Sequence, residues 1–115
     1  MAVTIKTDRA RIAARIKAGA RKMVFAVSEQ ALSDCNEFVR VDQGQLRNSS
    51  YTASDTEKGE LVWDTPYAKR VYFTGTPSKD ANPNASLQWC EKAHDTYGED
   101  WNRIAQKNFD EGMGQ

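Results

Sequence analysis

Side chains that could carry out chemistry are few in this sequence, and they are scattered. His94 is the single histidine, and it is surrounded by charged residues in the stretch 91–95. A general base needs a positioned partner and a matched pKa, and a lone histidine beside carboxylates is far more often a surface residue. The glycines are scattered, and none precedes a Lys-Ser or Lys-Thr pair as in a phosphate-binding loop. We therefore nominate no catalytic or cofactor-binding residue, and we expect neither enzyme activity nor a cofactor.

The two cysteines, Cys35 and Cys90, lie at apolar positions of segments with helical spacing. With one histidine they are too few to build a zinc site, so we expect no bound metal. Neither cysteine has the electropositive, exposed surroundings that a thiolate nucleophile needs. We interpret both as reduced core thiols in a cytosolic setting.

Charge is distributed unevenly along the 115 residues, although the formal net charge is zero. Residues 1–29 hold seven Lys and Arg side chains against two carboxylates, whereas residues 91–115 hold six carboxylates against three cations. Opposite charges at the two ends can pair within one chain, or they can steer copies head to tail around a ring. No targeting segment or membrane span is visible, so we expect an aqueous, non-secretory compartment and no membrane partner.

The basic N-terminal stretch has two interpretations. Its cations could meet a phosphate backbone, but no known nucleic-acid-binding motif follows them. The favoured interpretation is a solvated face or a subunit interface. A third, intermediate interpretation is a helix that lines a channel through which DNA passes, without reading the DNA sequence. The candidate interface or DNA-channel residues are Arg11, Arg15, Arg21 and Lys22.

The periodicity predicts a single α+β domain over residues 1–115, with a long N-terminal amphipathic helix packed on a small antiparallel sheet. The helix spans 8–38, with apolar residues at spacings of three and four. A sheet region follows at 46–73, with strands at 46–53 and 60–64, a turn at 56–59, and a strand or short helix at 67–73. A polar loop covers 74–86, and one or two C-terminal helices cover 87–111, where Gly98 is expected to stop or kink the helix.

Three segments carry a resemblance to a known family. The stretch 41–49 (VDQGQLRNS) resembles the V-D-T-G-x-L-R-x-S signature that follows the long N-terminal helix in phage minor capsid and neck proteins, with Gln43 as a departure. The stretch 63–70 (WDTPYAKR) is similar to their P-Y-A segment. The stretch 82–93 is similar to their N-P-x-A…W-x-E-x-A segment. The order and spacing of all three match over roughly residues 8–110.

The resemblance implies a structural virion protein of a tailed phage or prophage that joins head and tail as part of a connector ring. Copies would contact one another, a head-closure protein and a tail-completion protein, and DNA would pass non-specifically through the channel. The protein would reside in the virion neck, and in the host cytoplasm during assembly. A related tail-terminator protein and a small DNA-binding or regulatory module are the alternatives.

The signature residues make physical sense as architecture. Asp42 can form an Asx-type turn and Gly44 can adopt positive φ, which would redirect the chain from helix to sheet. Leu46 would then point inward and Arg47 outward along the first strand. We predict an architectural role for Asp42, Gly44, Leu46, Arg47, Pro66, Tyr67 and Trp89.

Overall fold

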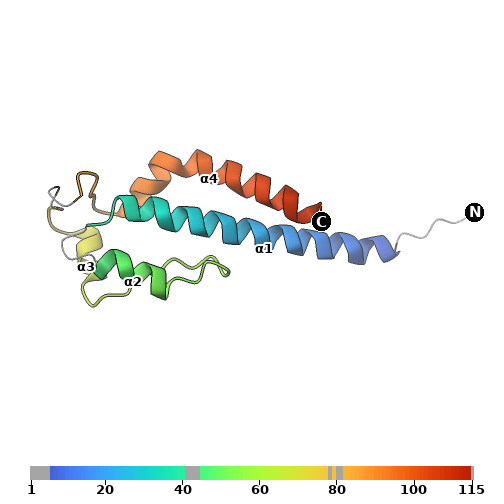
Figure 1. Ribbon diagram of the computed structural model, residues 1–115, viewed down its shortest axis with the longest axis horizontal. Helices are drawn as coiled ribbons and strands as arrows, with labels where there is room; N and C mark the ends of the chain where they lie inside the picture. Colours follow the sequence, from blue (N-terminus) through green and yellow to red (C-terminus); the bar gives the residue numbers. More distant parts are fainter. Residues whose placement is uncertain (1–5, 41–44, 78, 80–81, 115) are drawn as a thin grey trace, which may run out of the picture.

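The computed structural model describes residues 6–40, 45–77, 79 and 82–114. These residues form four helices, which are α1 (Lys6–Glu37), α2 (Gln45–Ala53), α3 (Ala68–Phe73) and α4 (Trp89–Met113) (Figure 1). The molecule measures 73 × 26 × 19 Å and has a radius of gyration of 18.9 Å. A compact domain of roughly 100 residues has a radius of gyration of about 13 Å. The protein is therefore a rod, whose long axis follows α1.

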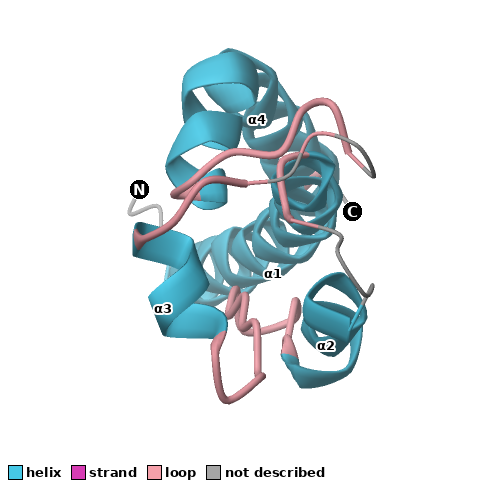
Figure 2. Cartoon of the chain, turned by 90° about the vertical axis from the view of Figure 1, so that its left-hand side faces the viewer, coloured by secondary structure: helices cyan, strands magenta, loops and turns pink. Residues whose placement is uncertain are grey.

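Helices α1 and α4 pack side by side in opposite directions, while α2 and α3 lie on the other side of α1 (Figures 1 and 2). Near the C-terminal end of α1, the Tyr97 hydroxyl donates a 2.5 Å hydrogen bond to the Glu37 carboxylate. Nearer the middle of α1, Lys22 pairs with Glu111 at 2.9 Å. These two contacts join the helices in the first half of α4 and near its C-terminal end.

The backbones of α1 and α4 touch at a pair of glycines. A Cβ atom on Gly112 would lie 2.7 Å from the Cα atom of Gly19, and a Cβ atom on Gly19 would lie 2.8 Å from the Phe109 carbonyl oxygen. No side chain larger than hydrogen fits there without movement of the backbone. Glycine costs a helix interior about 1 kcal/mol relative to alanine, and at this contact the close approach of the two helices explains its presence.

The hydrophobic core lies at one end of the rod, where the C-terminal end of α1 meets α2, α3 and the first turns of α4. Trp89 is its largest fully buried side chain. The rings of Trp63 and Tyr72 pack edge-on against Trp89, with centroids at 5.8 and 4.5 Å. The buried members of this cluster are Cys35, Phe38, Val39, Leu46, Ala68, Trp89 and Ala93. We call this part of the molecule the core end.

The predicted α+β class is wrong, because the described residues are all-α apart from one isolated antiparallel bridge between Asp55 and Glu60. The first expected strand, 46–53, lies in α2. Its serines do not prevent helix formation, since the Ser49 and Ser50 hydroxyls each donate to a carbonyl three residues back, at 2.7 Å. Leu46 and Ser50 are both buried, and their spacing of four is helical rather than alternating.

The second expected strand, 60–64, does not form: Glu60 makes the isolated bridge with Asp55, and 61–64 have no regular secondary structure. The Val62 N–H donates to the Ser54 hydroxyl at 2.8 Å, and the Asp64 N–H donates to the Ser49 hydroxyl at 3.0 Å. Side chains from α2 and its C-terminal end thus accept the hydrogen bonds that a neighbouring strand would accept. The turn expected at 56–59 is confirmed, with Gly59 at φ +75°, but it does not connect two strands.

The remaining elements, which are the expected helices and the loop 74–86, agree with the structure. The long helix expected at 8–38 is confirmed as α1, and the region 67–73 contains the short helix α3 rather than a strand. The described residues of the loop 74–86 lie outside helices. The C-terminal helices expected at 87–111 are one helix, α4, and Gly98 does not stop it. One glycine costs only about 1 kcal/mol in a helix, which the packing of α4 along α1 outweighs.

Replacing glycine with alanine is expected to have opposite effects at two positions of α4. Gly112→Ala should lower the free energy of unfolding by about 1–3 kcal/mol, because its Cβ would collide with the α1 backbone. Gly98→Ala should raise it by about 0.5–1 kcal/mol, because its Cβ would meet only the His94 ring at 3.4 Å. Urea unfolding followed by circular dichroism measures both changes. Equal effects of the two substitutions would contradict the glycine contact.

Candidate functional site

Among the described residues, ionisable side chains meet at the exposed His94–Asp95 pair and at the two thiols of the core end. No group of three or more metal-binding side chains is found among these residues, and none of their helices is long and apolar enough to span a membrane. The His94 side chain is 72% exposed and lies 3.9 Å from the Asp95 carboxylate. This pair is therefore solvated on the surface of α4.

The two thiols meet inside the core end. Cys35 is buried, Cys90 is half-buried, and both are free. A hydrogen bond with Cys90, together with burial, raises the pKa of the Cys35 thiol well above its ordinary value. Burial, with a contribution from Cys90, also raises the pKa of Tyr72 to about 12. The Cys35 thiol and the Tyr72 hydroxyl are consequently neutral at physiological pH, whereas the hydrogen bond with Cys35 lowers the pKa of the Cys90 thiol.

The first signature segment lies at the junction of α1 and α2. Asp42 and Gly44 fall outside the described residues, so their predicted turn stays a prediction. Leu46 is buried in the core. The expectation that Arg47 points outward along a strand is wrong, because Arg47 belongs to α2 and its guanidinium donates to the Asn36 carbonyl at 2.8 Å. Arg47 thereby links α2 to the last turn of α1.

Asn36 is a buried hydrogen-bonding centre that the sequence analysis did not nominate. It is 3% exposed. Its amide oxygen accepts from the Trp63 indole N–H at 3.0 Å, and its amide nitrogen donates to the Ser50 hydroxyl at 2.9 Å. One side chain of α1 thus holds α2 and the segment before α3. Its position next to the apolar residues of α1 was the available signal, but nothing in the sequence identified its partners.

Asn82, in the third signature segment, covers the C-terminal end of α1. It is 7% exposed, and its amide nitrogen donates to the carbonyls of Glu37 and Val39, both at 2.8 Å. Its amide oxygen accepts from the Asn84 N–H at 3.0 Å. The last carbonyls of a helix lack partners within the helix, so this amide supplies what the helix end requires. Nothing in the sequence of this segment indicated this role for Asn82, because its partners lie more than 40 residues away in the chain.

The remaining signature residues lie against the same core. Pro66 is exposed, whereas Tyr67 is half-buried, packs against the core and occupies the position before the first residue of α3. Trp89 is the first residue of α4. The preceding residue, Gln88, has φ +49°, and its N–H donates to the Tyr72 carbonyl at 2.8 Å. All three signature segments therefore have described residues at the core end, and their architectural role stays a prediction.

The basic residues of α1 lie toward the opposite end of the rod. Every residue from Ala10 to Ala18 is exposed, and we call this segment the arm. It extends beyond the C-terminal end of α4 (Figure 1). Of the four candidate cations, Arg11, Arg15 and Arg21 are exposed, while Lys22 pairs with Glu111.

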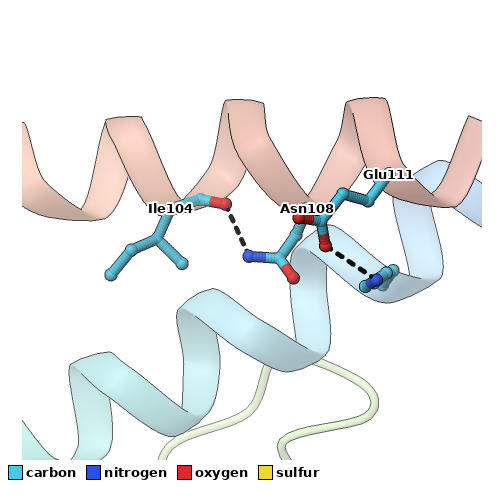
Figure 3. A network of polar contacts seen from close by, with 4 residues as sticks. Ile104, Asn108 and Glu111 are labelled. Atoms are coloured by element: carbon cyan, nitrogen blue, oxygen red, sulfur yellow. Dashed lines mark hydrogen bonds and ion pairs between the residues drawn. The ribbon is translucent and has the colours of Figure 1, made fainter.

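Glu111 reaches from α4 toward α1, and one turn earlier on α4 the Asn108 amide donates to the Ile104 carbonyl at 2.8 Å (Figure 3). The Lys22 ammonium group lowers the pKa of the Glu111 carboxyl. Within the described residues, this is the single ion pair between the basic part of α1 and α4. Among the residues that the structure describes, pairing of the two charged ends within one chain is therefore slight.

Asn82→Asp tests the predicted structural role of the third signature segment. A carboxylate cannot donate to the two carbonyls at the end of α1, so we expect a loss of at least about 1–3 kcal/mol in unfolding free energy. Asn84→Asp is the matched control, because Asn84 is exposed and contributes its backbone N–H to this loop. It should change stability by less than about 0.5 kcal/mol. Thermal unfolding of the two variants measures these changes. An Asn82→Asp variant as stable as the wild type would argue against the role of Asn82 at the C-terminal end of α1.

Comparison with known proteins agrees with the three signature segments. Residues 3–109 match the family model described as minor capsid protein. No curated protein and no solved structure shows significant similarity to the chain. The family match covers nearly the whole chain and confirms the resemblance seen in the sequence. The chain therefore belongs to the minor capsid protein family, and it is a structural component of a phage virion.

Proposed function

We propose that this minor capsid protein is a neck protein, which forms part of a connector ring between the head and the tail of a tailed phage. The observation that carries the proposal is the two-ended shape of the molecule. The rod is 73 Å long, with an exposed basic arm at one end and a compact core at the other. A protein that joins two different structures needs two different surfaces, and this rod offers them.

Apolar side chains are exposed toward both ends of the rod. Ile12 and Ile16 are 51% and 46% exposed on the arm, and Phe73 is 53% exposed at the core end. Phe73 lines an open groove of about 350 Å³ together with Trp63 and Tyr72. Exposed apolar side chains that gather around a groove are typical of protein-binding surfaces. These surfaces suit the proposed partners, which are other copies of the chain, a head-closure protein and a tail-completion protein.

The exposed cations support a non-specific contact with DNA inside the ring. Arg11, Arg15 and Arg21 are exposed, so they could face phosphates in the channel without reading base sequence. The same exposure favours the second candidate function, a small DNA-binding module. A duplex bound by the isolated protein, with affinity that falls steeply as salt rises, would favour that second function.

Deletion of the gene from its phage or prophage tests the neck assignment. If the protein joins head and tail, the lysate should contain filled heads and separate tails that fail to join, as seen by electron microscopy. Supplying the intact gene in trans should restore joined particles and serves as the control. Tails of irregular length would point instead to the tail-terminator alternative. Normal infectious particles would overturn the neck role altogether.

A further inference from the structure

The apolar stripe of α1 extends toward the N-terminus beyond the part of α1 that α4 covers. Gly19 is buried and Met23 is half-buried along α4, whereas Ile16 and Ile12 are 46% and 51% exposed. The pairing of α1 with α4 is antiparallel, so positions before Gly19 would find their partners beyond Met113, where α4 ends. Two isoleucines in the same stripe thus lack the cover that the rest of the stripe has within the described residues.

The surroundings of these isoleucines are basic. Arg11, Arg15 and Lys17 are exposed beside them, and none of the three forms an ion pair with a described residue. A surface that suits the arm should therefore offer carboxylates together with some apolar contact. Duplex DNA offers phosphates, but beside them its backbone offers only the small apolar surface of the deoxyribose carbons, which is little cover for Ile12 and Ile16. A protein surface fits this combination better.

The first half of α4 carries a complementary surface. Glu91, Asp95 and Glu99 are exposed at intervals of four residues, so they share one face of the helix at steps of about 6 Å. Arg11 and Arg15 have the same interval. A groove of about 540 Å³ runs beside Asp95 and Glu99, and Gly98 lines it. We call Glu91, Asp95 and Glu99 the acidic face.

The arm and the acidic face cannot meet within one molecule. The acidic face lies on the first turns of α4 at the core end, and the arm lies at the opposite end of the 73 Å rod (Figure 1). The partner that carries the matching charges at the matching interval is a second copy of this chain. Contacts of this head-to-tail kind produce rings when the rotation between copies closes.

We propose that the arm of one copy docks on the acidic face of the next copy, with Arg11 and Arg15 facing Glu91, Asp95 and Glu99. Ile12 and Ile16 then pack beside α4 of the neighbour. This contact gives the proposed ring its subunit interface. It removes Arg11 and Arg15 from the proposed DNA contact and leaves exposed Arg21 for it. It rests on the proposed function only in taking copies to associate with one another.

Reciprocal charge reversal tests the contact with purified full-length protein. One variant carries Arg11→Glu and Arg15→Glu, and the other carries Asp95→Arg and Glu99→Arg. Sedimentation velocity at protein concentrations up to about 1 mM, in about 50 mM salt, detects even weak association. Wild type should self-associate, and each variant alone should associate at least about tenfold more weakly. An equimolar mixture of the two variants should associate again, because each arm then meets an oppositely charged face.

Two matched controls separate this contact from a general effect of net charge. Lys58→Glu with Arg70→Glu changes the net charge as the arm variant does, at exposed positions of the turn 56–59 and of α3. Glu60→Arg with Asp64→Arg matches the acidic-face variant at exposed positions of the segment before α3. Both controls should associate like wild type, and all variants should keep the wild-type circular dichroism spectrum.

Several outcomes would overturn the proposal. They are a wild type that stays monomeric throughout the concentration range, a mixture that fails to associate, and controls that lose association like the variants. Binding of a fluorescent duplex by a monomeric wild type, lost in the arm variant, would assign the arm to DNA instead. The gene deletion tests the neck role separately. If the purified copies associate but the gene deletion leaves normal phage particles, this contact stands and the neck role is wrong. If the copies stay monomeric but the deletion leaves heads and tails unjoined, the neck role stands and this contact is wrong.

Discussion

The contact between the backbones of Gly19 and Gly112 determines how the rest of the molecule is divided. Because the two helices touch there without intervening side chains, it sets the register in which α4 covers α1. C-terminal to that point, α4 covers one side of α1, and α2 meets only the C-terminal part of α1 (Figure 1). N-terminal to it, the arm is exposed. A single close approach therefore separates a part of α1 that stabilises the fold from a part available for assembly.

The core end is organised by two buried amides rather than by a sheet. Asn36 joins α1 to α2 and to Trp63, and Asn82 covers the last carbonyls of α1. A buried amide with all its partners in place specifies one arrangement of the chain, because any shift leaves a polar atom unpaired in the interior. This explains how segments with little regular structure hold a defined position around Trp89.

Sequence reasoning succeeded where the signal is local and periodic. The apolar spacing predicted α1, and the three signature segments identified the family, which the match over residues 3–109 confirms. It failed over 46–64, because a stretch rich in serine and threonine suggests strands, whereas here Ser49 and Ser54 accept backbone hydrogen bonds. The roles of Asn36 and Asn82 could not be predicted, since their partners are distant in the chain. The predicted role of the arm cations stays a prediction.

Because α1 is one continuous helix, its length determines both the distance and the relative rotation between the arm and the core end. The arm and the core end belong to one helix without a break, so about 1.5 Å of rise and 100° of rotation per residue connect their positions. An insertion of one residue between them would turn the isoleucines of the arm away from their present direction. An insertion of about seven residues would restore the direction and lengthen the rod by about 10 Å. Evolution of this chain should therefore accept length changes in α1 in whole helical repeats, each of which would alter the distance between the arm and the core end.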